Sequence, residues 1–178
     1  MFEPSESYAF DLTHFAADAK QLDEAAFATR HGRGFLVLSR ESAGLQVPEG
    51  PRKTVALEAR NAGEHWKPVR FHVWPIQKSD RSLIARFVSV GRTRRNDVVI
   101  PDVSLSKFHA YVVEEEGELR LQDARSKNGT FIDGARVAPQ GDGGPTVLRS
   151  GAKVRFGAVE LTYLDAAGLR RLAREMAG

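Results

Sequence analysis

Several polar residues in the second half of the chain have the chemistry needed to hold an oxyanion. Arg92 can direct two hydrogen bonds at a phosphate or a carboxylate, and Ser106 can add a hydroxyl donor. Lys107 and Lys127 can each contribute a positive charge. Asn128 differs from these, because its amide both donates and accepts, which suits the main chain of an extended peptide. The residue types therefore predict a site for an anionic peptide.

Short apolar runs of strand type separate these polar clusters. They cover residues 98–100 and 110–113, and Leu119 and Leu121 alternate with polar residues before Asp123. The polar clusters should therefore lie on loops at the ends of strands. Three loops that present an arginine, a serine and an asparagine to one place can form a rigid site on a sandwich scaffold.

The order and spacing of the clusters resemble the forkhead-associated (FHA) domains, a family of β-sandwiches that bind phosphothreonine peptides. The resemblance covers roughly residues 69–165. Each matching motif alone is a weak signal, whereas the ordered set is specific. In chain order the motifs are Gly91-Arg92, Asn96-Asp97, Ile100, Ser106-Lys107-Phe108-His109-Ala110, Asp123 and Ser126-Lys127-Asn128-Gly129-Thr130.

The resemblance implies a role for each matching residue. Arg92 and Ser106 bind the phosphate, and Asn128 holds the peptide main chain beside the phosphothreonine. Lys107 stands where the family more often has arginine, which keeps the charge without the planar fork. We expect the peptide to be bound by Arg92, Ser106, Lys107, Lys127 and Asn128, and the site to be supported by Gly91, His109, Gly129 and Thr130.

The composition is typical of one main domain with an appendage. The 178 residues are 42% hydrophobic and 28% charged, which is enough for a buried core. The net charge of +3 has no dense basic run, so an anionic peptide is a better partner than nucleic acid. The lack of cysteine excludes disulfides and thiolate metal sites. The polar, acidic start and the absence of a long apolar run predict a cytoplasmic protein that does not engage a membrane.

The predicted fold is mainly β: an FHA-like β-sandwich with an N-terminal α+β extension and a short C-terminal helix. We expect the extension over residues 1–68. It is too small to be stable alone, so it should pack on the sandwich. The FHA-like domain should cover residues 69–165, and the C-terminal helix residues 166–178.

Within the extension, apolar residues at helical spacing predict one helix or two short ones. They lie between Leu12 and Arg30, with Asp23 as a cap for the second piece. Strands are expected to follow at residues 35–39 and 54–59.

Three functions from different classes are compatible with these residues. The first is an adaptor that binds a threonine-phosphorylated protein, such as a Ser/Thr kinase or its substrate. The second is an assembly scaffold that uses the same loops without phosphate. The third is an enzyme with Ser106 as nucleophile and His109 as base. The complete set of Arg92, Ser106 and Asn128 favours the adaptor.

The sequence predicts neither catalytic residues nor a metal or cofactor site. No orienting acid stands at a recognisable spacing from Ser106 and His109, and no Gly-x-Ser-x-Gly elbow is present. The other histidines lack metal-ligand spacing, and the glycine-rich stretch at residues 140–145 lacks the Gly-Lys-Ser/Thr of a phosphate-binding loop.

Overall fold

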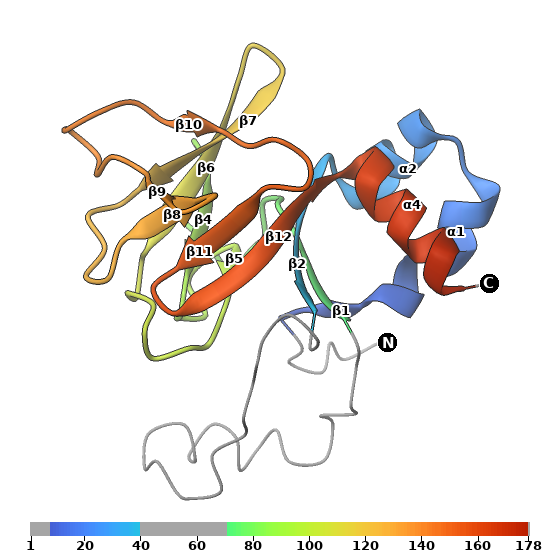
Figure 1. The fold of residues 1–178 in the computed structure, drawn as a ribbon, viewed down its shortest axis with the longest axis horizontal. Helices are drawn as coiled ribbons and strands as arrows, with labels where there is room; N and C mark the ends of the chain where they lie inside the picture. Colours follow the sequence, from blue (N-terminus) through green and yellow to red (C-terminus); the bar gives the residue numbers. More distant parts are fainter. Residues whose placement is uncertain (1–7, 40–70, 178) are drawn as a thin grey trace, which may run out of the picture.

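The computed structural model of the protein describes residues 8–39 and 71–177 (Figure 1). Two β-sheets form one half of the molecule, and helices gather beside one end of the larger sheet. The predicted strand at residues 54–59 lies outside the described residues. The mainly β sandwich predicted from the sequence is confirmed.

The strands belong to two sheets. The larger sheet contains β1 (Phe10–Asp11), β2 (Gly34–Ser39), β3 (Phe71–Pro75), β8 (Thr130–Ile132), β9 (Ala135–Arg136), β11 (Lys153–Phe156) and β12 (Val159–Asp165). The smaller sheet contains β4 (Val88–Gly91), β5 (Val98–Val99), β6 (Ala110–Glu115), β7 (Glu118–Asp123) and β10 (Thr146–Val147). Their orders are β1-β3-β2-β12-β11-β8-β9 and β10-β7-β6-β4-β5. Neighbouring strands pair antiparallel, except that β4 and β5 run parallel.

Two tight turns follow directly from local sequence. Asp133 and Gly134 join β8 to β9 with φ angles of 48° and 81°. Glu116 and Gly117 join β6 to β7 with φ angles of 54° and 78°. An Asp-Gly pair favours this left-handed geometry, because glycine adopts positive φ without steric cost.

The helices are η1 (Leu12–Phe15), α1 (Ala16–Gln21), α2 (Glu24–His31) and α4 (Ala166–Met176). Asp23 caps α2 by accepting a hydrogen bond from the backbone N–H of Ala26 at 2.8 Å, as predicted. Asp165 caps α4 in the same way, with Gly168 as donor at 2.7 Å. Leu169 of α4 is buried, whereas Met176 at its last position is 41% exposed. The last turn of α4 extends past the core.

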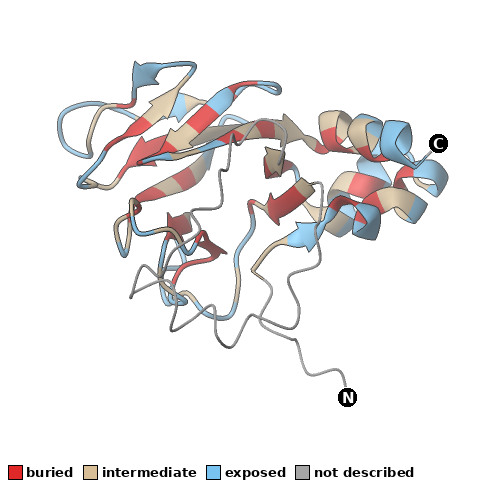
Figure 2. Ribbon diagram, turned by 60° about the horizontal axis from the view of Figure 1, so that its bottom comes forward, coloured by how far each residue is buried: buried red, intermediate tan, exposed pale blue. Residues whose placement is uncertain are grey.

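One apolar core lies between the two sheets. It receives side chains from both, among them Leu36, Trp74, Val90, Val112, Leu121, Val154 and Phe156. A second buried cluster covers the other face of the larger sheet, where the helices pack. Its members include Phe15, Phe27, Phe35, Val37, Val73 and Leu169. Figure 2 shows buried positions on the strands of both sheets and on the helices.

Strand β2 is buried on both faces. It lies between β12 and β3, with Leu36 in the sandwich core and Phe35 and Val37 under the helices. A continuous apolar run is typical of a strand in this position, since neither face meets water. The segment assigned to the N-terminal extension therefore supplies an inner strand of the larger sheet. The division of the chain at residue 68 stays a prediction.

Among the described residues, no helix has both the length and the apolar character needed to cross a membrane.

Candidate functional site

Three loops meet at one end of the sandwich and line an open depression of about 470 Å³. Arg92 directly follows β4, whereas Ser106 and Lys107 lie in the segment that leads to β6. Lys127 and Asn128 lie between β7 and β8. The structure thus brings together all five residues predicted to bind the peptide. The full lining consists of Arg92, Val103, Ser104, Leu105, Ser106, Lys107, Phe108, Lys127 and Asn128.

The depression is positively charged. Arg92, Lys107 and Lys127 contribute cations, and none of the nine lining residues is acidic. All three side chains are exposed, and within the described ranges none of them forms an ion pair. Cations that converge in a hollow without carboxylates attract an anion by charge and by hydrogen bonding.

The Ser106 side chain connects two of the loops. Its hydroxyl oxygen accepts a hydrogen bond from the backbone N–H of Lys127 at 3.0 Å. The backbone carbonyl of Ser106 accepts a hydrogen bond from the backbone N–H of Arg92 at 3.1 Å. Because the hydroxyl oxygen already serves as acceptor, the hydroxyl proton can be donated to a bound oxygen. Ser106 therefore fixes the spacing of the loops and keeps a donor for a ligand.

Asn128 is exposed at the rim of the depression. Its Nδ2 donates to the carbonyl of Ser104 at 2.7 Å, which holds the amide plane in one orientation. In the described part of the chain its Oδ1 accepts no hydrogen bond. The oriented Oδ1 can therefore accept from the main-chain N–H of an extended segment.

His109 is fully buried (0% exposed) and joins two loops from below. Its Nδ1 accepts from the backbone N–H of Ser106 at 2.9 Å, so the ring proton lies on Nε2 and is donated to the carbonyl of Gly129 at 3.1 Å. Burial lowers the pKa of His109, although the bond to Gly129 acts in the opposite direction. The ring is therefore neutral and structural.

The hydrogen bonds of His109 do not favour the hypothesis in which Ser106 is a nucleophile and His109 its base. Both ring nitrogens of His109 are engaged by backbone groups, and neither accepts the Ser106 hydroxyl proton. A serine nucleophile needs a base within hydrogen-bonding reach of its hydroxyl.

Among the described residues, no group of histidine, aspartate and glutamate side chains is arranged to hold a metal ion.

The other predicted supports also lie in these loops. A side chain at Gly91 would collide with the backbone carbonyl of Lys107, so only glycine allows the two segments to approach. Gly129 has a φ of 81°, which favours glycine. The buried hydroxyl of Thr130 donates to Asp123 Oδ2 at 2.6 Å.

Two bracing residues were part of the sequence pattern without an assigned role. Asn96 Nδ2 donates to the carbonyl of Lys107 at 2.7 Å and to that of Thr93 at 2.9 Å. Asp123 accepts from the Ser126 backbone N–H at 2.9 Å and from its hydroxyl at 2.6 Å. Short polar side chains beside turns favour such bonds to nearby backbone groups. The positions of Asn96 and Asp123 beside turns are therefore the sequence feature from which their bracing role could have been expected.

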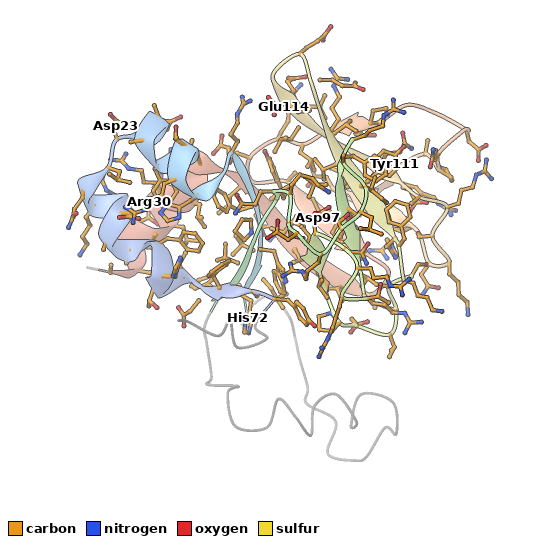
Figure 3. All side chains as sticks on the ribbon, turned by 180° about the vertical axis from the view of Figure 1, so that it is seen from behind. Asp23, Arg30, His72, Asp97, Tyr111 and Glu114 are labelled. Atoms are coloured by element: carbon orange, nitrogen blue, oxygen red, sulfur yellow. The ribbon has the colours of Figure 1, made fainter. Side chains whose placement is uncertain are left out.

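A third brace is the buried carboxylate of Asp97, which also belongs to the sequence pattern but whose bonding partners the sequence did not indicate (Figure 3). It accepts hydrogen bonds at 2.8 Å from Lys78 Nζ, from the backbone N–H of Ser79, and from both the N–H and the hydroxyl of Ser89. Burial by itself raises the pKa of Asp97, but the bonds from Lys78, Ser89 and Ser79 together lower it below the usual value. Asp97 thereby anchors the segment that precedes β4 to the loop that carries Arg92.

Comparison with known proteins gives a family match for part of the chain. Residues 88–157 match the model of the FHA domain. The chain is 39% identical over 84 residues to the ABC transporter ATP-binding/permease protein Rv1747 of Mycobacterium tuberculosis, covering 47% of this chain and 9% of that protein. It is 33% identical over 76 residues to the glycogen accumulation regulator GarA of Mycolicibacterium smegmatis, covering 43% and 44%. The chain thus spans less than half the length of either relative.

Solved structures give a related match. The NMR-based structure of the FHA-2 domain from the same Mycobacterium tuberculosis transporter is 37% identical, with a TM-score of 0.37. The match covers 48% of this chain and 72% of that one.

Proposed function

Because residues 88–157 of this chain are an FHA domain, we propose that the protein is an adaptor that binds threonine-phosphorylated segments of a partner protein. The partner would be a Ser/Thr kinase or a substrate of one. In this proposal Arg92 and Ser106 hold the phosphate, Lys107 and Lys127 add charge, and Asn128 binds the peptide main chain.

The observation that carries the proposal is the convergence of cationic and hydroxyl donors in a depression without carboxylates. A phosphate dianion can accept two parallel hydrogen bonds from a guanidinium and a third from a hydroxyl. These donors come from different loops, which Ser106 and His109 tie together. The site therefore needs little reorganisation to bind, which lowers the entropic cost of binding.

The peptide main chain would run past Asn128. The orientation of its amide, set by the bond to Ser104, presents Oδ1 for a backbone N–H. Such a contact does not depend on the peptide side chains, so it supports recognition of an extended segment beside the phosphate rather than of a free phosphate ion.

The experiment is calorimetric titration of the full chain with a phosphothreonine peptide selected from a degenerate library, and with its unphosphorylated form. Arg92→Ala should weaken binding by tens to about a hundredfold, or about 2 to 3 kcal/mol, because a charge-assisted bidentate contact is lost. The stability should change by less than about 0.5 kcal/mol, since Arg92 is exposed. Arg92→Lys should restore binding only in part.

Arg149→Ala is the matched control, because Arg149 is also exposed but lies outside the depression. It should bind as the parent does. If Arg92→Ala binds as tightly as the parent, or if the parent does not distinguish the phosphorylated peptide, the adaptor proposal fails. A phosphate-independent scaffold that uses the same loops would then replace it.

A further inference from the structure

Tyr8 lies against two arginines from segments that are distant from it in the sequence. The Cζ atom of Arg81 is 5.7 Å from the centre of the Tyr8 ring, and that of Arg94 is 6.0 Å from it. Tyr8 is half-buried, whereas both arginines are exposed. A guanidinium within about 6 Å of a ring centre is attracted to the face of the ring. The Tyr8 ring therefore connects the start of the chain to both segments.

Arg94 belongs to the loop that joins β4 to β5, and this loop also carries Arg92. Arg92 lines the depression. Near its other end the loop is held by Asn96, whose Nδ2 donates to the carbonyl of Lys107 at 2.7 Å. The contact between Tyr8 and Arg94 adds a restraint in the middle of the loop. It therefore acts two positions away from the arginine that lines the depression.

Arg81 is itself fixed to the domain. Its Nη2 donates to the carbonyl of Asp97 at 2.9 Å. The carboxylate of Asp97 is buried and paired with Lys78 at 2.8 Å. Because the Arg81 guanidinium is oriented by these bonds, a ring that packs on it has a defined position relative to the loop between β4 and β5.

The elements that follow Tyr8 also fix its position. Ala9 packs against the core of the sandwich, and Phe10 pairs with Val73 where β1 meets β3. The match to the FHA domain begins at residue 88. The N-terminal part of the chain therefore brings an aromatic ring to a loop of the FHA domain.

We propose that Tyr8 is a positioning residue for the phosphate-binding site. Its ring holds Arg94, and through Arg94 it restrains the loop that places the Arg92 guanidinium. A loop that is restrained before the ligand arrives loses less conformational entropy on binding. This inference rests on the proposed function, because the phosphate contact of Arg92 is the contact that the ring positions.

The first test is calorimetric titration of full-chain variants with the selected phosphothreonine peptide. Tyr8→Leu removes the ring and should weaken binding about threefold to tenfold, the size expected when exposed contacts of this kind are lost. Tyr8→Phe keeps the ring and should bind within about twofold of the parent. Tyr8→Leu that binds as tightly as the parent, or Tyr8→Phe that binds as weakly as Tyr8→Leu, overturns the role of the ring.

Phe10→Leu is the matched control. Phe10 is an aromatic residue of the same segment and is 42% exposed, but it packs on His14 and Phe15, with ring centroids 4.7 and 5.9 Å away. The variant should bind as the parent does, and thermal melting verifies that each variant is folded. If Phe10→Leu weakens binding as much as Tyr8→Leu, the effect comes from a loosened N-terminal segment and the positioning role is overturned.

A double-mutant cycle separates positioning from a general loss of stability. Tyr8→Leu should cost less affinity in an Arg94→Gln background than in the parent, because the ring then has no guanidinium of Arg94 to hold. Equal losses in the two backgrounds would overturn transmission through Arg94.

Hydrogen exchange of backbone amides tests the restraint without a ligand. The N–H groups of Arg92 and Asn96 donate to backbone carbonyls, so their exchange reports opening of the loop. Tyr8→Leu should exchange them several-fold faster than Tyr8→Phe, with β12 unchanged. Unchanged rates in the loop overturn the inference. If the rates rise but the parent does not prefer phosphothreonine over threonine, the adaptor proposal fails and the restraint by Tyr8 stands.

Discussion

A histidine is held at each of two ends of the molecule in different ways: His109 is fully buried at the loop end, and His31 is half-buried at the helical end. At the loop end, both nitrogens of His109 bond to backbone groups of separate loops. At the helical end, His31 packs on Phe27 and Phe15 with ring centroids 4.7 and 5.2 Å away. Among the described residues its ring has one hydrogen-bond partner, Asp18, which lies 2.7 Å from Nε2.

The two kinds of contact have different effects: hydrogen bonds position the side chains of the site, whereas apolar contacts stabilise the fold. Hydrogen bonds are directional, so the polar braces at the loop end fix where donors point. Apolar contacts are non-directional, so the aromatic cluster at the helical end stabilises the larger sheet without defining a site. In Figure 3, Asp23 and Arg30 lie among the helices, and Asp97 lies in the sandwich. Changes at the helical end should therefore affect stability alone, and changes at the loop end should also affect binding.

The largest effect on stability is expected from Phe27→Ala at the helical end. Phe27 is fully buried between Phe15, His31 and Phe35, so the substitution leaves a cavity and should cost about 3 to 5 kcal/mol. Urea unfolding measures this cost. The phosphopeptide affinity of the fraction that stays folded should match the parent, and a tenfold loss would contradict the separation of the two ends.

A somewhat smaller loss, with an effect on binding as well, is expected from His109→Ala. The substitution leaves the N–H of Ser106 and the carbonyl of Gly129 without partners, and each unmet buried group costs about 1 to 3 kcal/mol. The Ser106 loop should then move relative to the Gly129 loop. Urea unfolding and calorimetry should both report losses. Unchanged affinity in the folded variant would mean that His109 does not position the site.

The pH dependence of stability should involve both ends. Burial lowers the pKa of His109 and of His14 from 6.5, and for His14 the neighbouring His31 acts in the same direction. Below about pH 6.5 the unfolded chain therefore binds more protons than the folded chain. The free energy of unfolding should fall as pH drops from 6.5 toward the folded pKa values and change little through these groups above 6.5.

Variants with His109→Gln and with His14→Gln divide this dependence between the two ends. Each should show a shallower fall in urea-unfolding free energy below pH 6.5 than the parent. Slopes identical to the parent in both variants would contradict a histidine origin.

The smallest effect concerns the phosphorylated residue. The methyl group of phosphothreonine buried in the depression is worth about 0.8 kcal/mol, so phosphoserine peptides should bind several-fold more weakly. Calorimetry with matched peptides measures the ratio. Equal dissociation constants would show that the loop end recognises the phosphate charge and makes no contact that depends on the methyl group.

The sequence alone determined the features that depend on neighbours in the chain. The turn at Asp133 and Gly134 follows from residues that favour positive φ, and the start of α2 follows from the capping chemistry of Asp23. The order of the polar clusters likewise predicted that Arg92, Ser106 and Asn128 would meet, and they line one depression.

Only the tertiary structure decided the features that depend on contacts between distant residues. The run at Phe35 to Leu38 indicates a strand, but its place between β3 and β12 depends on which partners complete the sheet. Lys78 and Asp97 are 19 positions apart, and nothing local indicates that they pair. The exposure of Leu83 is likewise invisible in the sequence, since an apolar residue before a strand is expected to be buried. Hydrophobic pattern and turn chemistry act over a few residues, whereas pairing, burial on two faces and exposure are set by the packing of the whole chain.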